Sequence, residues 1–298
     1  MGALLILICT VIWGTAFLAQ KTGAEYFGPF TLTCYRNALA GVFLAVVILL
    51  RNAVRERRFA IRLGRTETLG GAASGAVLFA AMVTQQLGIE WTTPGISAFL
   101  TANYILFVPF LAWAIGGGRP PRVVWLAVAM ALAGTYLICD IRGLSPGRGE
   151  SWTLLCAALF AVQIMVVDRC ASKADVPVFS MVQLFTAAVC AAPFLFCASE
   201  TARLTAANLR AGWFQLFYVG VVSSGIAYTL QNLGQARTPA TVASVVMSFE
   251  SVVGAIAGYF VLGDRLSTAQ IAGCLLVFSG IIVSQMKRKN FSELAPCA

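Results

Sequence analysis

The chain has 298 residues, of which 59% are hydrophobic and 11% charged, and its mean hydropathy is +0.83. A soluble globule of this length needs far more polar surface than this composition supplies, so we expect the chain to use lipid as its solvent. The chain contains no histidine, and its nine cysteines include no C-x-x-C pair. These absences argue against a metal site and a disulfide scaffold, and they remove the commonest general base.

Ten apolar stretches are long enough to cross about 30 Å of hydrocarbon at roughly 1.5 Å per residue. In chain order the predicted spans cover residues 3–20, 30–50, 69–88, 94–115, 122–139, 151–167, 178–198, 212–231, 239–262 and 268–286. The first run follows Met1-Gly2 with no basic segment before it, so we expect a retained span rather than a cleaved signal peptide. The predicted fold class is an all-α integral membrane protein with ten transmembrane helices.

The chain contains its own sequence twice, since Thr84–Ala98 returns as Leu230–Ser244. An offset of 146 residues aligns six identical pairs, namely Leu87 with Leu233, Gly88 with Gly234, Thr92 with Thr238, Gly117 with Gly263, Arg119 with Arg265 and Gly134 with Gly280. The earlier parts align more loosely at an offset of 147, with Cys9 opposite Cys156 and Arg36 opposite Gln183. We therefore predict a first repeat over 1–140, a second over 150–287 and a cytoplasmic tail over 288–298.

Each repeat contains five spans, and five is an odd number, so the second repeat must enter the membrane from the opposite side to the first. The repeats are therefore predicted to be inverted. Inverted repeats are typical of transporters, because two half-structures can exchange conformations and open a central cavity alternately to each side.

Lysine and arginine in the loops set the predicted orientation. With both termini in the cytoplasm, 14 cations lie on the inner side: Arg51, Arg55, Arg57, Arg58, Arg62, Arg65, Arg119, Arg122, Arg169, Lys173, Arg237, Lys287, Arg288 and Lys289. Six lie outside, namely Lys21, Arg142, Arg148, Arg203, Arg210 and Arg265, and Arg36 lies inside a span. We attribute the net charge of +9 to these loop cations, which set the orientation and can also bind anionic lipid. We expect no nucleic-acid partner.

Five short motifs give the chain a family resemblance. They are Ile12–Gln20 in the first span, Tyr35-Arg36 in the second, Tyr218–Gln231 in the eighth, Ser248–Val252 in the ninth and Leu262–Leu266 after it. Together, in this order, they resemble the EamA-type branch of the drug/metabolite transporter superfamily over essentially the full length. The resemblance implies a ten-helix carrier with a central cavity between two inverted repeats. It also implies export or exchange of amino acids or similar small metabolites across a bacterial inner membrane.

The chain departs from the family pattern at two positions. Asp264 stands where the family usually has Glu, and Ser251 stands where many members have Pro. The first lies in a loop and the second at an expected helix bend, so both differences bear on gating more than on membership.

Two charges lie well inside predicted spans, where charge is costly and usually functional: Arg36 and Glu250. At roughly 1.5 Å per residue, Arg36 lies about 9 Å and Glu250 about 18 Å below the outer surface, within reach of each other if their helices are neighbours. Glu250 is a candidate to bind a substrate ammonium or to carry a coupling proton, and Arg36 to attract a substrate carboxylate. The alternatives are a fixed ion pair between the two, or a Glu250 that bonds only to backbone at a bend.

Polar residues recur at matched places in the repeats, because Gln85 and Gln86 correspond to Gln231 and Asn232. They are candidates to line the cavity, and the alternative is ordinary hydrogen bonding between helices. Asn103 and Tyr104 are further candidates, with Tyr104 opposite Glu250 at the 146 offset. Trp13, Gln163, Gln183 and Tyr228 are weaker ones, because an aromatic or amide side chain in a span more often serves packing.

The favoured function is a secondary carrier that works by alternating access on a small-molecule substrate, with proton coupling possible, no cofactor, and a monomer or homodimer as the assembly. A channel or lipid scramblase on the same duplicated fold is the alternative. A membrane-embedded enzyme is less expected, because the chain has no histidine and one buried acid. Amino acids come first among substrates through the family resemblance and because the opposite charges of Arg36 and Glu250 suit a zwitterion. A phosphate site would call for more than one buried cation.

Two dipeptides mark predicted helix starts, Thr93-Pro94 and Thr238-Pro239. In each, threonine is expected to cap the helix and proline to occupy its first helical position.

Overall fold

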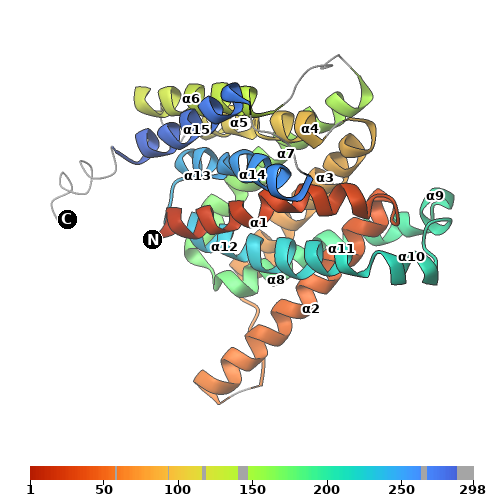
Figure 1. Ribbon diagram of the computed structural model, residues 1–298. Helices are drawn as coiled ribbons and strands as arrows, with labels where there is room; N and C mark the ends of the chain where they lie inside the picture. Colours follow the sequence, from red (N-terminus) through yellow and green to blue (C-terminus); the bar gives the residue numbers. More distant parts are fainter. Residues whose placement is uncertain (58, 93, 116–118, 140–146, 263–266, 287–298) are drawn as a thin grey trace, which may run out of the picture.

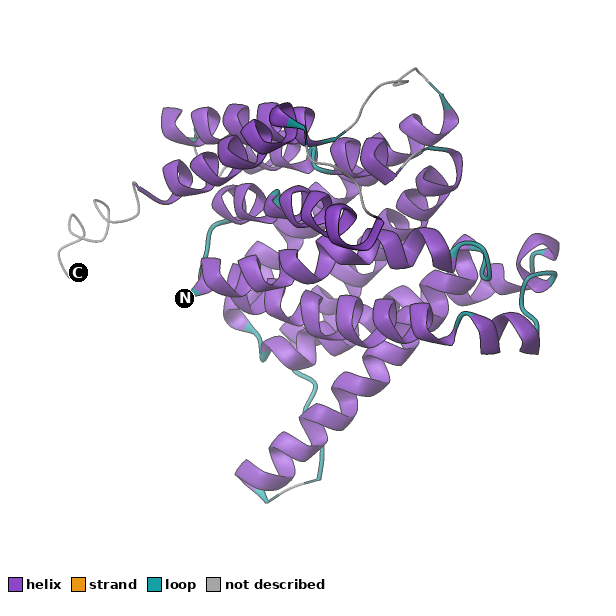
Figure 2. Ribbon diagram, viewed as in Figure 1, coloured by secondary structure: helices purple, strands orange, loops and turns teal. Residues whose placement is uncertain are grey.

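A computed structural model describes the chain except for residues 58, 93, 116–118, 140–146, 263–266 and 287–298. The predicted tail 288–298, most of the Leu262–Leu266 motif and the matched glycines Gly117 and Gly263 lie outside the described residues. The described part consists of helices and their connections and contains no strand (Figures 1 and 2).

The longer helices and helix pairs occupy the ten predicted places, and the short helices α9 and α10 lie between the seventh and eighth. Their bounds are α1 Gly2–Gly23, α2 Pro29–Glu56, α3 Arg65–Trp91, α4 Pro94–Thr101, α5 Tyr104–Ala114, α6 Arg122–Ile138, α7 Arg148–Cys170, α8 Val176–Ala191, α9 Ala198–Thr201, α10 Ala206–Ala211, α11 Trp213–Phe217, α12 Ala227–Gln235, α13 Ala240–Met247, α14 Phe249–Leu262 and α15 Thr268–Met286. Short 3₁₀ turns follow α7 (Ala171–Lys173) and α8 (Ala192–Phe196), and a π-helix (Tyr218–Ile226) joins α11 to α12. Among the described residues, nine spans are long and apolar enough to cross a membrane, and α6 is a shorter apolar helix of 17 residues.

The fourth and ninth spans are interrupted at matching positions. The first break separates α4 from α5 at Ala102–Asn103, and the second separates α13 from α14 at Ser248, which is 146 residues after Ala102. The Asn103 amide donates to the Phe99 and Leu100 carbonyls at 3.0 and 3.1 Å, and the Ser248 hydroxyl donates to the Val245 carbonyl at 2.6 Å. Polar side chains thus satisfy carbonyl groups that the breaks release, as a membrane interior requires.

The two repeats are interlocked. Helix α1 packs on α12 and α14 of the second repeat, while α7 packs on α3, α4 and α5 of the first (Figure 1). The close approaches match between the repeats, since Gly88 faces Gly149 in the first crossing and Gly234 faces Gly2 in the second. The first helix of each repeat therefore packs mainly against helices of the other repeat.

Helices α6 and α15 are repeat-related and lie against each other. Gly134 of α6 faces Gly273 of α15, and Gly280 of α15 faces Ala127 of α6, so one contact becomes the other when the 146-residue register is applied. As the residue number rises on one helix it falls on the other, which means that the pair is antiparallel. The predicted inverted repeat is therefore confirmed at this helix pair.

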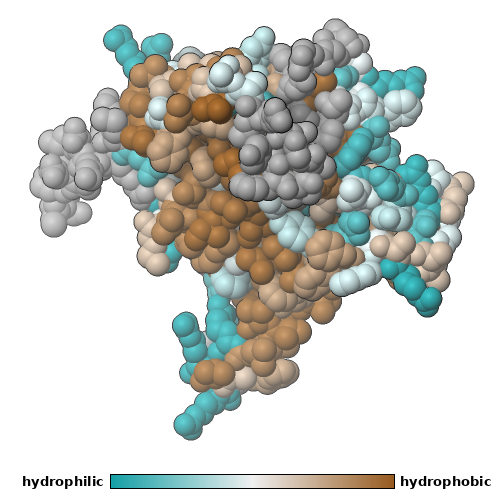
Figure 3. Space-filling model, in the orientation of Figure 1, coloured by the Kyte–Doolittle hydropathy of each residue, from teal (hydrophilic) through white to brown (hydrophobic). Residues whose placement is uncertain are grey.

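The surface of the described helices suits a lipid environment. Hydrophobic side chains cover the middle of the face shown in Figure 3, and hydrophilic ones gather near the helix ends. Exposed apolar residues include Val46, Leu50 and Val54 on α2 and Leu275 on α15. The apolar surface of these helices is the part that hydrocarbon would cover.

The start of α13 differs from the expected threonine cap. Pro239 is the N-cap residue rather than the first helical residue, and the Ala240 backbone nitrogen donates to Asp168 Oδ1 of α7 at 2.8 Å. The Thr238 hydroxyl is buried and has no partner among the described residues. The expectation was wrong here because a carboxylate from another helix supplies the cap, a contact between elements that a local motif does not reveal. In the matching dipeptide, Thr93 lies outside the described residues.

We expect Gly134→Ala to lower the free energy of unfolding by about 1–3 kcal/mol relative to the control Gly254→Ala. An added Cβ at Gly134 would lie 2.7 Å from the Gly273 carbonyl oxygen and 2.8 Å from the Val277 nitrogen. At Gly254 in α14 the nearest atom would be the Gly14 carbonyl oxygen at 3.5 Å. Both substitutions raise helix propensity equally, so thermal unfolding in detergent isolates the packing cost. Equal midpoints would contradict the close α6–α15 approach.

Candidate functional site

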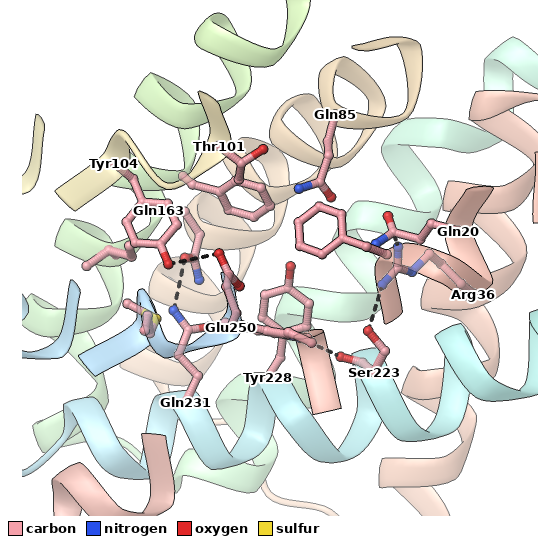
Figure 4. Close-up of a pocket in the computed structure, with 15 residues that line it drawn as sticks. Gln20, Arg36, Gln85, Thr101, Tyr104, Gln163, Ser223, Tyr228, Gln231 and Glu250 are labelled. Carbon is pink, nitrogen blue, oxygen red and sulfur yellow. Dashed lines mark hydrogen bonds between the residues drawn. The ribbon is translucent and has the colours of Figure 1, made fainter. Parts of the chain in front are cut away.

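A central cavity lies where both repeats meet, and Figure 4 shows its polar residues. Its volume is about 40 Å³, and its lining residues are Trp13, Phe17, Gln20, Arg36, Gln85, Thr101, Tyr104, Phe160, Gln163, Ile164, Ser223, Tyr228, Gln231, Met247 and Glu250. A single water needs about 10–15 Å³, whereas sites for small molecules usually measure about 300–1,000 Å³. The cavity therefore has room for a few waters, and a metabolite requires the helices around it to move apart.

Glu250 lies in the first turn of α14, directly after the Ser248 break, and only 5% of it is exposed. Its Oε1 accepts a hydrogen bond from the Tyr104 hydroxyl at 3.1 Å, and Tyr104 begins α5 directly after the matching break. The two residues are 146 positions apart and so occupy equivalent places in the two repeats. Residues that a two-fold axis exchanges can touch only beside that axis, so Glu250 lies at the centre of the duplicated structure.

Arg36 of α2 is also buried, with 5% exposed, and has three neutral acceptors. Its Nε donates to Ser224 Oγ at 2.9 Å, its Nη2 to Ser223 Oγ at 3.3 Å and its Nη1 to Gln20 Oε1 at 3.3 Å. Within the described part of the chain, Arg36 and Glu250 form no ion pair with each other or with any other residue. The guanidinium and the carboxylate are therefore both buried, and the described residues supply no counter-ion to either.

Tyr228 lies between the two charges and packs against Trp13. Their rings pack at 4.9 Å with an interplanar angle of 58°, and the Trp13 indole nitrogen donates to the Ser223 carbonyl at 3.1 Å. Figure 4 shows the Tyr228 hydroxyl between the Glu250 carboxylate and Arg36, pointing into the cavity. The cavity thus presents a cation, a hydroxyl and an acid in order along one wall.

Seven of the ten candidates from sequence line the cavity: Trp13, Arg36, Gln85, Tyr104, Tyr228, Gln231 and Glu250. The other three form bonds elsewhere among the described helices. Gln86 donates to the Gln20 carbonyl at 3.3 Å, Asn232 donates to Ser180 and Gln183, and Asn103 bonds to its own turn. These three contacts agree with the alternative of helix-to-helix or local hydrogen bonding.

The EamA-like transporter family matches the chain twice, over residues 1–139 and again over 147–286. The chain belongs to the EamA-like transporter family. It is a multi-pass membrane transporter, and the resemblance to the drug/metabolite transporter superfamily drawn from the sequence is confirmed.

Two relatives match this EamA-like chain over nearly its whole length. An uncharacterized transporter from Archaeoglobus fulgidus is 21% identical over 94% of the chain and 84% of its own length. The uncharacterized transporter YwfM from Bacillus subtilis is 23% identical over 94% of the chain and 92% of its own length. A solved crystal structure shares the fold, with a TM-score of 0.77 and 19% identity, covering 96% of this chain and 97% of that one.

The EamA-like chain also uses site residues that the sequence did not single out. Gln20, Ser223 and Ser224 surround the Arg36 guanidinium, although the motifs Ile12–Gln20 and Tyr218–Gln231 contain all three. Ser223 and Ser224 lie in the π-helix, and its wider turn places both hydroxyls beside the Arg36 guanidinium. Hydropathy does not predict a π-helix. Gln163, a weaker candidate, lines the cavity as well.

We expect Arg36→Gln to unfold at a midpoint no lower than that of the wild type. The change removes a buried charge that has only neutral partners among the described residues, while glutamine can still bond to the serine hydroxyls. The control is Arg51→Gln, which breaks the exposed Arg51–Asp175 bridge of 2.7 Å and should cost about 0–1 kcal/mol. Thermal unfolding in detergent gives both values, and a loss above about 3 kcal/mol in Arg36→Gln would assign the arginine a structural role.

Proposed function

We propose that this transporter is a secondary carrier of zwitterionic small metabolites, amino acids first, that works by alternating access. The observation that carries the proposal is a buried cation and a buried acid in one cavity with no ion pair between them. Isolated buried charges are expensive, and a substrate with a carboxylate and an ammonium supplies a counter-ion to each. Tyr228 between them offers a hydroxyl to the same ligand.

Two charged residues at equivalent positions of the repeats each form a hydrogen bond with the end of another helix. Lys21 Nζ of α1 donates to the Ile89 carbonyl near the end of α3 at 2.9 Å, and Asp168 of α7 accepts from the Ala240 nitrogen at the start of α13 at 2.8 Å. Lys21 and Asp168 are 147 positions apart, the offset that aligns the first parts of the repeats. The lysine meets a helix C-terminus and the aspartate a helix N-terminus, which are the favourable ends for each charge.

Each of these contacts borders a hollow on its own face. Lys21 lines one of about 330 Å³ with Glu90, Trp91 and Arg203, and Asp168 lines one of about 370 Å³ with Arg169 and Pro239. We propose that the Lys21 contact closes the outer mouth and the Asp168 contact the inner one. Opening either contact alone would connect the central cavity to one side, as alternating access requires.

Glu250 is the proposed coupling residue. Among the described residues it is the one acid that lines the central cavity, and its carboxylate accepts a hydrogen bond from a neutral hydroxyl rather than from a cation. A carboxylate in this position can hold either a proton or a substrate ammonium, so the two compete for one site. A proton gradient could then drive substrate movement without a nucleotide or cofactor.

The proposed location is a bacterial inner membrane with both termini in the cytoplasm. The excess of arginine between α2 and α3, on the side where α1 begins, supports this orientation. One chain supplies every lining residue of the cavity, so a monomer or a homodimer could transport. Lipid contacts the outer helix faces.

We expect proteoliposomes with the wild-type chain to take up a labelled amino acid with saturation, and faster under an inward-directed proton gradient. Glu250→Gln cannot release a proton, so its ratio of rates with and without the gradient should fall to about one. Asp175→Asn, which changes an exposed acid outside the central cavity and outside both hollows, should keep the wild-type ratio.

The same uptake assay separates the other readings. Saturable uptake that ignores the gradient in both wild type and Glu250→Gln would make the protein a facilitative carrier with an uncoupled Glu250. Flux that rises in proportion to substrate, or movement of labelled lipid between leaflets, would replace the carrier with a channel or a scramblase.

The proposed gates predict a local loss of protection. Asp168→Ala should speed amide hydrogen exchange at the start of α13 by several-fold, because the Ala240 nitrogen loses its acceptor. Lys21→Ala is the matched control and should leave α13 unchanged while it loosens the end of α3. Mass-spectrometric exchange of peptides over 236–247 and 85–92 measures both, and equal exchange in both variants at both places would contradict two separate gates.

A further inference from the structure

Five amide side chains and a serine lie buried in two hydrogen-bonded clusters on α7, α8 and α12. They are Gln163, Gln231 and Gln235 in one cluster and Ser180, Gln183 and Asn232 in the other, none more than 3% exposed. Gln231 Nε2 donates to Gln163 Oε1 at 3.4 Å and to Gln235 Oε1 at 2.9 Å. Asn232 Nδ2 donates to Gln183 Oε1 at 2.7 Å and to Ser180 Oγ at 2.9 Å. Two of the amides, Gln163 and Gln231, line the central cavity.

In each of two amide pairs, Gln163–Gln231 and Gln183–Asn232, two of the four side-chain polar atoms have a partner among the described residues. Gln163 Nε2 and Gln231 Oε1 are buried and have no partner among the described residues, so one donor and one acceptor are left over in the pair. Gln183 Nε2 and Asn232 Oδ1 are left over in the same way behind it. Exchanging the oxygen and nitrogen positions of an amide changes which atoms lack a partner, but it does not give every atom one. The single hydrogen bond within a pair uses one carbonyl and one NH₂ group, and the pair contains two of each. Unpaired buried donors and acceptors are costly, and they indicate a missing partner.

The Gln163–Gln231 pair has a defined place relative to the two charges. Figure 4 shows Arg36 on one side of Glu250 and the amide pair on the other. If an amino acid binds with its carboxylate at Arg36 and its ammonium at Glu250, the amide pair lies beyond the ammonium. The side chain of the amino acid can then extend toward the pair. The repeats do not duplicate this pair, because Ala16 stands at the position of Gln163 in the first repeat.

We infer that Gln163 and Gln231 form the subsite for the side chain of the transported amino acid, and that they select a side chain with both a donor and an acceptor, a carboxamide or a hydroxyl. This inference rests on the proposed function. A carboxamide offers an NH₂ to Gln231 Oε1 and a carbonyl to Gln163 Nε2, which completes both amides. An aliphatic side chain of equal size leaves both groups unpaired, and sites built to hydrogen-bond their substrate discriminate strongly against such analogues.

The apolar lining does not remove this selectivity. Phe160, Ile164 and Met247 offer an aliphatic side chain surface to contact, so such a substrate can still enter. The amide pair sets the difference in affinity between a polar and an aliphatic substrate, because only the polar side chain forms hydrogen bonds with Gln163 and Gln231. The expected signature is a change in preference, with uptake of the aliphatic substrate maintained.

The test compares asparagine with leucine, which have nearly the same shape, as labelled substrates in proteoliposomes. The wild type should transport asparagine with the higher kcat/KM. Gln163→Met and Gln231→Met keep an unbranched side chain of similar length but no amide, and each should lower the asparagine-to-leucine ratio of kcat/KM at least about tenfold, mostly through loss of asparagine uptake. Gln215→Leu is the control. Its amide also has a buried oxygen without a described partner, but it lies on α11 outside the cavity, so the ratio should not change.

The outcomes separate this inference from the function on which it rests. If both amino acids are taken up and the methionine variants leave the ratio unchanged, the subsite is overturned and the carrier function is kept. This is the result expected if only water binds to the Gln163–Gln231 pair. A wild type that takes up neither asparagine nor a hydroxyl amino acid, but does take up others, also overturns only the subsite. A wild type that takes up no labelled amino acid overturns both. If a methionine variant does not fold, Gln163→Asn withdraws the donor by one methylene and should shift the ratio in the same direction by a smaller factor.

Discussion

The hydrogen bond between Tyr104 and Glu250 joins two equivalent positions of a duplicated chain, and the arrangement of the cavity follows from it. Such a bond can form only beside the axis that relates the repeats. Both residues begin a helix directly after a break, and both breaks hold their released carbonyls with a nearby polar side chain. A membrane interior tolerates irregular backbone only where such partners exist, so the breaks and the buried acid depend on each other.

The chemistry of the site is asymmetric although the backbone is duplicated. Arg36 has Gln183 as its counterpart, Glu250 has Tyr104, and the π-helix that carries Ser223 and Ser224 corresponds to regular helix in α3. Each charge thus occurs once. A symmetric scaffold gives two conformations of similar energy, which exchange between sides requires, while a single cation and a single acid give the cavity a direction in which a dipolar ligand can lie.

Much of this arrangement could be predicted from the sequence. The ten apolar stretches located the spans, the 146-residue offset identified the inverted repeats, and the rarity of charge in hydrocarbon selected Arg36 and Glu250. Two features that the sequence did not reveal depend on contacts between distant segments. Asp168 caps α13 in place of Thr238, and Ser223 and Ser224 accept hydrogen bonds from Arg36. Local patterns carry no record of which helix becomes a neighbour, so these two features had to come from the structure.

The interlocked repeats also have a consequence for biosynthesis. Helix α1 leaves the ribosome well before its partners α12 and α14, which begin at Ala227 and Phe249. Its contact surface, including Gly2, Ile6 and Gly14, therefore has no native partner until more than two thirds of the chain has been made. During that interval lipid or an insertion factor must cover α1, and a first half released alone would keep that surface open. Assembly of this transporter is thus a late event that waits for the ninth span.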